Sequence, residues 1–447
     1  MKSVINRLRI NKPDKLLLDS FWAIAGNILN KSLAFIAGIF VARYLGSIDF
    51  GQFGILKSTS LSLSSFATLG LGYTATRFVS KYKDNNSYKI EHIIKLLYIL
   101  PIGLSICLSL IVIALIDPIS KSIIKSSVVD NYLIYVLLSV LLNSLLTTQI
   151  GIIAGLGLFK KMAKVNGFIG AISFLITCSL SFFYGVDGAI QAFVLVSLIN
   201  VIINYVIVAK EICNYHVKKT GGFSFQTRPL LSEIVRYTIP VSIQELVYAS
   251  TSWGLIILLL RSSSFSEVGL YNASVQWSVV LLFIPGILRN VVLSHMSVGN
   301  LDIRGRDLIL NKTLLFNFSI TLFPSIVICV FSNYIDNIYG ESYSGVGSVI
   351  TILAFNAVFT SMSGVLSQAY LAEGKNWLLL IIRSIRDFGI LLAFYMALIH
   401  THSINSSLSL AITLLCGNAT FFVAMWMMFK LIIREKINEN CWNCNNP

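Results

Sequence analysis

The segment KEICNYHVKKTGGFSFQTRPLLSE, from Lys210 to Glu233, is the longest hydrophilic stretch of the chain and divides it into two apolar halves of similar length. Working outward from it, we count six apolar runs on each side, each close to the roughly 20 residues that cross a bilayer as a helix. The runs lie near residues 18–42, 50–76, 92–116, 132–156, 162–184, 187–208, 234–260, 266–296, 308–331, 346–372, 377–399 and 406–431. We therefore expect an all-α integral membrane protein of twelve transmembrane helices in two six-helix lobes.

The composition excludes a water-soluble protein. Of 447 residues, 55% are hydrophobic and only 12% are charged, and the mean hydropathy is +0.78. Soluble domains are about one quarter charged, so the apolar excess must face lipid. The net charge of +14 therefore does not indicate a nucleic-acid partner.

The distribution of basic residues predicts the orientation. Most of the 34 lysines and arginines lie in the N-terminal segment, the central linker, the tail and alternate loops, which the positive-inside rule places in the cytoplasm. Both termini are then cytoplasmic. The predicted units are an N-terminal lobe (1–209), a cytoplasmic linker (210–233), a C-terminal lobe (234–432) and a cytoplasmic tail (433–447).

The two halves carry an internal repeat. The pattern R-x5-D-x-G-x-F from Arg43 to Phe53 recurs in the second half as R-x5-E-x-G-x-Y from Arg261 to Tyr271. Likewise Q-x5-G from Gln149 to Gly155 recurs from Gln368 to Gly374, at the same offset to within a single position. Two anchors that share one offset indicate a duplication. Because six helices separate the copies, both enter the membrane in the same direction, which predicts a parallel repeat.

No catalytic or metal-binding constellation is visible. The one Gly-Lys pair, Gly374-Lys375, is followed by asparagine and lacks the glycine-rich loop of a nucleotide-binding site. The motifs H-E-x-x-H and G-x-S-x-G are absent. Seven cysteines include one C-x-x-C, Cys441 and Cys444, which is a weak metal signal without a second pair. We expect no enzymatic activity, no metal and no cofactor.

Polar and ionisable residues at membrane depth are the best candidates for a site, because they are costly in lipid and usually mark a substrate or ion pathway. Lys31 lies near the centre of the first span, and Glu245 is the lone acid at depth in the seventh, at the repeat position of Asn27. The candidate substrate-binding residues are Lys31, Lys57, Arg289, Arg386 and Asn27, and the candidate ion-coupling residues are Glu245 and Asp387.

Structural roles compete with several of these assignments. Arg383 and Asp387 are spaced i, i+4 and can neutralise each other, and Arg289 can reach the membrane surface by snorkelling. Arg43 and Asp49 suit a paired turn. Lys31 is too central for an easy route to water. Several cations with few acids favour an anionic cargo, best a phosphate or diphosphate held by charge-assisted hydrogen bonds.

The chain resembles the Wzx-type polysaccharide flippases of the multidrug, oligosaccharidyl-lipid and polysaccharide exporter superfamily. The resemblance covers essentially the whole chain. It is carried by S-x6-N-x3-K-x9-V-A-R-Y-L-G-x3-F-G-x-F (Ser20 to Phe53), LGLGYTATRFVSKY (Leu69 to Tyr82), VGLYNAS (Val268 to Ser274) and QAYLAEG (Gln368 to Gly374).

This resemblance implies a MATE-like fold in the bacterial inner membrane and alternating-access transport, coupled to protons or another ion, of an undecaprenyl-diphosphate-linked oligosaccharide, typically an O-antigen repeat unit. An O-antigen polymerase and a chain-length regulator are its implied partners, besides membrane lipids. Lys31 falls on a functional first-helix arginine of the related lipid II flippases, and a second such arginine falls on Ala37. The alternatives are a multidrug or small-solute exporter of the same fold and a membrane glycan polymerase or ligase.

Overall fold

The computed structural model describes residues 12–82, 87–115, 131–214, 227–286, 303–373, 375–400 and 405–445, and within these ranges the chain is helical with short connections. The first half contains α2 (Lys12–Thr68), α3 (Leu71–Tyr82), α4 (Ser87–Ala114), α7 (Leu133–Leu156) and α8 (Phe159–Asn214). The second half contains α9 (Thr227–Ser262), α10 (Phe265–Leu281), α12 (Ile303–Val330), α13 (Ser332–Tyr339), η2 (Glu341–Tyr343), α14 (Val346–Ala372), α15 (Asn376–His400) and α16 (Ser406–Asn445).

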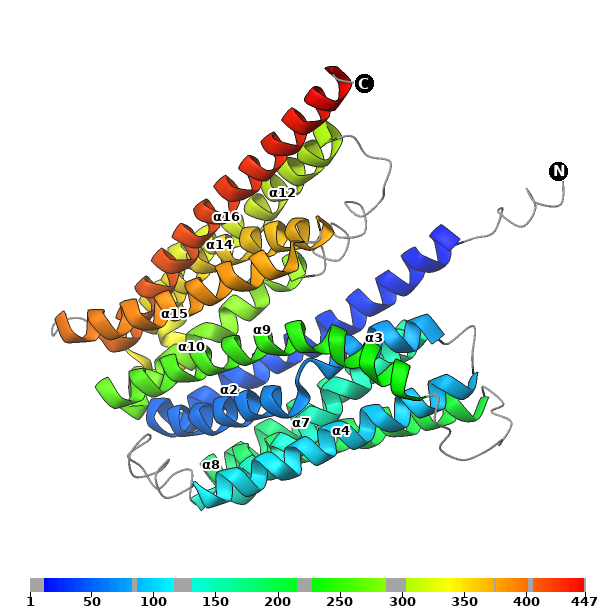
Figure 1. Cartoon of the computed structure of the whole chain (residues 1–447). Coiled ribbons are helices and arrows are strands. Elements are labelled where there is room, and N and C mark those ends of the chain that lie inside the picture. The colour runs from blue at the N-terminus through cyan, green and yellow to red at the C-terminus, as the bar shows by residue number, and fades with distance from the viewer. Residues whose placement is uncertain are drawn as a thin grey trace.

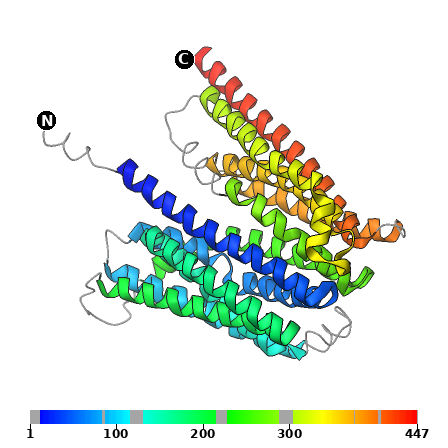
Figure 2. The same ribbon diagram turned by 180° about the vertical axis from the view of Figure 1, so that it is seen from behind.

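The helices form two bundles, which we call the first and second lobes. Figure 1 shows α2 to α8 as one bundle and α10 to α16 as the other, with α9 along the boundary between them. The reverse view in Figure 2 shows the same division, with the start of α2 and the end of α16 at the same end of the molecule. The all-helical membrane fold predicted from the sequence is confirmed.

A helix occupies each of the twelve predicted spans when the two long helices are counted as two spans each. α2 bends at Gly46 and α8 bends at Gly185, where the backbone has φ values of 74° and 60°. Glycine adopts such values without a steric penalty. The two halves of α2, and likewise those of α8, are therefore joined at a single glycine and not by a loop. Eight of the described helices are long and apolar enough to cross a membrane.

Two boundaries differ from the predicted spans. The second span is divided at Leu69 and Gly70, both with positive φ, and the chain continues as the amphipathic helix α3. At the other end, α16 continues through the predicted tail to Asn445, because no glycine or proline interrupts the sequence after the last apolar run.

The buried apolar residues show where the lobes join. One core belongs to the first lobe alone and includes Phe78 and Ile152, and another belongs to the second lobe alone and includes Leu310 and Phe429. The largest core contains residues of both lobes, from Val41 and Phe50 through Leu259 to Tyr343. The lobes therefore share a core at the end opposite the start of α2 and the end of α16, and have separate cores toward those helix ends.

Candidate functional site between the lobes

The lobes cross most closely where the two repeat motifs face each other. A β-carbon added at Gly51 in α2 would collide with the carbonyl group of Phe265, and one added at Gly269 in α10 would collide with the carbonyl group of Ser47. The repeat that relates Arg43 to Arg261 also relates Gly51 to Gly269 and Ser47 to Phe265. The hydroxyl groups of Ser47 and Ser266 lie 2.7 Å apart beside this contact. We call Ser47, Gly51, Phe265, Ser266 and Gly269 the crossing; they mark an approximate two-fold axis between the lobes.

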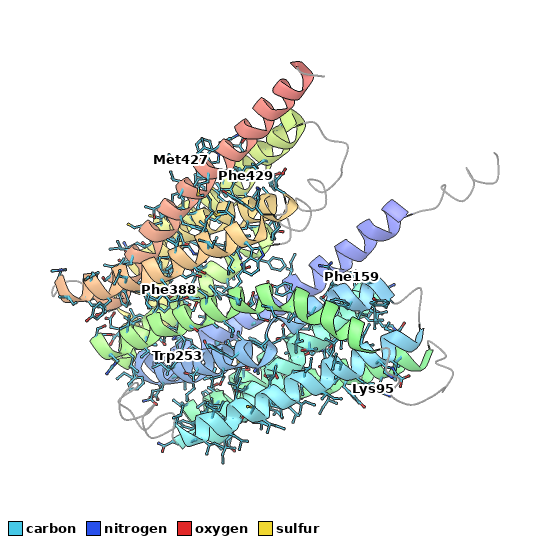
Figure 3. All side chains as sticks on the ribbon, viewed as in Figure 1. Lys95, Phe159, Trp253, Phe388, Met427 and Phe429 are labelled. Carbon is cyan, nitrogen blue, oxygen red and sulfur yellow. The ribbon has the colours of Figure 1, made fainter. Side chains whose placement is uncertain are left out.

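Aromatic residues extend the inter-lobe surface from the crossing toward the start of α2. On one side, the rings of Phe35 in α2 and Trp277 in α10 pack edge to face with centroids 5.0 Å apart. On the other side, Trp253 Nε1 in α9 donates to Thr59 Oγ1 in α2 at 3.0 Å, and Trp253 is labelled in Figure 3. In the repeat, Phe35 is equivalent to Trp253, and Thr59 is equivalent to Trp277. The two contacts are therefore related by the same approximate two-fold axis.

Lys31 lies on this inter-lobe surface, one turn of α2 before Phe35. Its ammonium group lies 5.4 Å from the centroid of the Phe283 ring, which belongs to the other lobe, and its side chain is exposed. A cation over an aromatic face is attracted by the ring quadrupole. Lys31 therefore bridges the lobes through this contact while the residue stays exposed.

Lys57 takes a different position, beside the crossing but turned toward its own lobe. Its ammonium group lies 5.9 Å and 6.0 Å from the ring centroids of Phe53 and Phe193. Its side chain is solvent-accessible. An exposed charge at membrane depth is costly where it faces lipid, so the two aromatic contacts are the interactions of its ammonium group that the structure shows.

The second lobe brings four ionisable residues together on α9 and α15. Asp387 Oδ1 accepts hydrogen bonds from Arg386 Nε and Nη2, both at 2.7 Å. The guanidinium carbon of Arg386 lies 4.7 Å from the centroid of the Phe421 ring. Arg383 interacts electrostatically with both Glu245 and Asp387. The packing of α15 on α9 therefore places both predicted ion-coupling acids within electrostatic range of Arg383.

The remaining predictions have mixed outcomes. Asp387 accepts a hydrogen bond from its neighbour Arg386, and it also interacts electrostatically with Arg383, the residue to which the i, i+4 spacing relates it. Arg43 Nη1 donates to the carbonyl oxygen of Ile338 at 3.3 Å and so contacts the second lobe instead of Asp49. Arg289 and the side chain of Asn27 lie outside the described part of the chain, and their predicted roles stay predictions.

The Arg386–Asp387 pair yields a stability prediction. Both side chains are mostly buried, with 16% and 10% exposed, and removing one partner of a buried pair leaves an uncompensated charge. We expect Asp387→Ala to reduce the free energy of unfolding by about 3 kcal/mol, measured by denaturation in detergent. The double variant Arg386→Met/Asp387→Leu should regain most of this loss because it leaves no charge. A single variant as stable as the wild type would contradict the prediction.

A separate cavity of about 320 Å³ lies between α2 and the first half of α8. Its lining is mostly aromatic: Phe40, Tyr44, Phe174, Cys178, Ser179, Phe182 and Phe183. None of the predicted site residues lines it. This cavity therefore lies apart from the inter-lobe surface.

Sequence reasoning missed Trp253, Trp277 and the bridging position of Arg383. The repeat offered a signal for the first two, because it relates Trp253 to Phe35 and Trp277 to Thr59 in the motif-bearing helices. For Arg383, no sequence signal relates it to Glu245, since only the packing of α15 on α9 brings these residues together.

Comparisons with known proteins agree with this architecture. The family model described as polysaccharide biosynthesis protein matches residues 16–292. No match is found among curated proteins.

Solved structures of MATE-type transporters share the fold. An inward-facing multidrug resistance MATE family transporter of the MOP superfamily superimposes with a TM-score of 0.74 at 15% identity, covering 92% of this chain and 98% of that one. An outward-facing form gives 0.63 at 14% identity, covering 96% and 97%. A MOP superfamily transporter from Pyrococcus furiosus gives 0.67 at 15% identity, with coverage of 96% and 97%.

Proposed function

Because the chain belongs to the polysaccharide biosynthesis protein family, we propose that it is a flippase for an undecaprenyl-diphosphate-linked oligosaccharide, such as an O-antigen repeat unit. It moves this lipid-linked glycan from the cytoplasmic to the periplasmic leaflet of the bacterial inner membrane, with both termini in the cytoplasm. The lobes open alternately to the two sides. An O-antigen polymerase and a chain-length regulator are the proposed partners downstream.

The charge between and within the lobes is the observation that carries this proposal. Four cations, Lys31, Lys57, Arg383 and Arg386, accompany two acids, Glu245 and Asp387, and together they leave a net charge of +2 when all are ionised. Both acids interact with arginines, whereas both lysines lie over aromatic rings. A diphosphate suits such a surface because it accepts charge-assisted hydrogen bonds from several cations at once.

Each residue then has a proposed role. Lys31 contacts the diphosphate from the inter-lobe surface, and Lys57, Arg289 and Asn27 contribute further polar contacts. Arg386 acts through its pairing with Asp387. Arg383 interacts electrostatically with both Glu245 and Asp387, so protonation of either acid would change the balance of charge around Arg383, and this change is the proposed link to an ion gradient.

Multidrug export is the alternative within this fold. For the Pyrococcus furiosus transporter, reversed polarity of the binding pocket suggests a different function. By the same reasoning, the cationic excess of this chain favours an anionic cargo over a cationic drug.

The leaflet position of the lipid-linked glycan tests the proposal. In a strain deleted for the gene, we expect the glycan to accumulate on the cytoplasmic side and the wild-type gene to reverse this. Lys31→Ala should reduce translocation at least tenfold with normal amounts of protein in the membrane, whereas Lys31→Arg should retain part of it because the charge is kept.

The control for Lys31 is Lys95→Ala. Lys95 is exposed and pairs with Glu91 one turn away on α4, so its replacement should leave translocation unchanged. Normal translocation in the deletion strain would reject the flippase proposal. Full activity of Lys31→Ala would reject only the role of Lys31.

A further inference from the structure

We infer that the segment formed by α13 and η2, residues 332–343, is a latch that holds the lobes together at the end where they share a core. The inference concerns how this end is kept closed, and it does not depend on which cargo the protein carries. The latch is defined by where it is anchored and by what it contacts.

The segment is anchored to the second lobe. It connects α12 to α14 and packs on α14. Asp336 Oδ1 accepts a hydrogen bond from the backbone N–H of Gly347 at 2.6 Å. Tyr339 Oη accepts one from Trp277 Nε1 at 3.0 Å. These contacts make the segment move with the second lobe.

The segment also contacts the first lobe, on both sides of the bend in α2. Tyr343 Oη donates to the carbonyl oxygen of Ala42 at 3.0 Å, and its ring lies 6.5 Å from that of Phe50. Ala42 lies in the last turn before the bend at Gly46, where carbonyl groups lose helical partners. Arg43 contributes the bond to Ile338 described above. The segment therefore binds a point of α2 that accepts additional hydrogen bonds.

Burial makes these contacts strong. Tyr343 and Tyr339 are among the largest fully buried side chains of the described chain, and their rings pack 5.3 Å apart. Burial also raises the pKa of Tyr343, so that its hydroxyl group keeps the proton that it donates to Ala42. Opening this end requires the two tyrosines to leave the shared core or α13 to leave its own lobe.

The same residues connect the latch to the inter-lobe surface. Trp277 donates to Tyr339 and packs on Phe35, and Phe35 lies one turn of α2 from Lys31. A ligand that displaces Phe35 or Trp277 would therefore disturb the hydrogen bond that orients Tyr339 in the latch.

The test measures how often the crossing opens. Ser47 is 5% exposed, so a Ser47→Cys reporter, in a background without the seven native cysteines, reacts with a hydrophilic maleimide only when the lobes separate. We expect Tyr343→Phe to raise the labelling rate of purified protein in detergent by three- to tenfold. Arg43→Met should act in the same direction, and the two together should exceed either one.

The matched control is Tyr334→Phe. Tyr334 lies on the same helix α13 but is exposed, and it packs on Phe331 within its own lobe, so this variant should label at the rate of the reporter alone. Unchanged labelling in both Tyr343→Phe and Arg43→Met would overturn the latch. An equal increase in Tyr334→Phe would also overturn it, because the effect would then be a general loosening of the protein. Melting temperatures of all variants identify any that do not fold, and Arg43→Met keeps the test decisive if Tyr343→Phe is one of them.

Discussion

Oxidation of a Ser47→Cys/Ser266→Cys variant should abolish transport, and a reducing agent should restore it. The two hydroxyl oxygens lie 2.7 Å apart, and the sulfur atoms of a disulfide lie about 2.0 Å apart, so two cysteines at these positions need only a small shift to bond. The bond would fix α2 to α10 at the crossing. The proposed alternating access requires this end to open, and a covalent bond would prevent it.

The measurement needs proof that the bond has formed. A protease site inserted between residues 215 and 226 allows the lobes to be separated after transport is assayed, and linked lobes stay together on a non-reducing gel. Each single-cysteine variant, treated with the same oxidant, is the control, again without the native cysteines. Undiminished transport by fully linked protein would show that the lobes do not separate at the crossing.

The sequence predicted the elements of this site better than their arrangement. Hydropathy identified the helices of both lobes, because burial in lipid imposes long apolar runs, and the repeat of Arg43 to Phe53 at Arg261 to Tyr271 identified both motifs of the crossing. Neither signal shows that the two motifs contact each other. That contact depends on how the lobes pack, and a repeat in sequence is compatible with lobes joined at either end.

The charged residues illustrate the same limit. Lys31 could be selected by its depth alone, and the structure places it on the inter-lobe surface. The helical spacing of Arg383 and Asp387 indicated an interaction between them, and Arg383 does interact electrostatically with Asp387. The spacing did not show that Arg386 also donates a hydrogen bond to Asp387, or that the packing of α15 on α9 brings Glu245 near Arg383. The latch was beyond prediction, since Tyr343 and Ala42 are 301 residues apart and no pattern relates them.

Replacement of Gly269 by alanine should reduce transport more than tenfold, although alanine favours helix formation. In an isolated helix this change is stabilising by about 1 kcal/mol. Here the added methyl group would meet the carbonyl carbon, carbonyl oxygen and α-carbon of Ser47. Because these are backbone atoms, no side-chain rotation can relieve the collision, and α2 and α10 would have to move apart. The closed end would then no longer form.

Two further variants make this prediction specific to the crossing. Gly51→Ala should cause the same defect, since the two-fold relation gives it the equivalent collision with Phe265. Gly103→Ala in α4 should leave transport unchanged, because an added β-carbon there meets nothing within 4 Å. The Ser47→Cys reporter should label faster in the Gly51→Ala variant. Gly51→Ala suits this measurement because its added methyl group collides with Phe265, whereas that of Gly269→Ala would collide with the reporter position itself. If Gly269→Ala and Gly51→Ala transported as well as Gly103→Ala, close approach of the lobes at the crossing would not be required for function, and closure of this end would have to depend on the latch and the surrounding core.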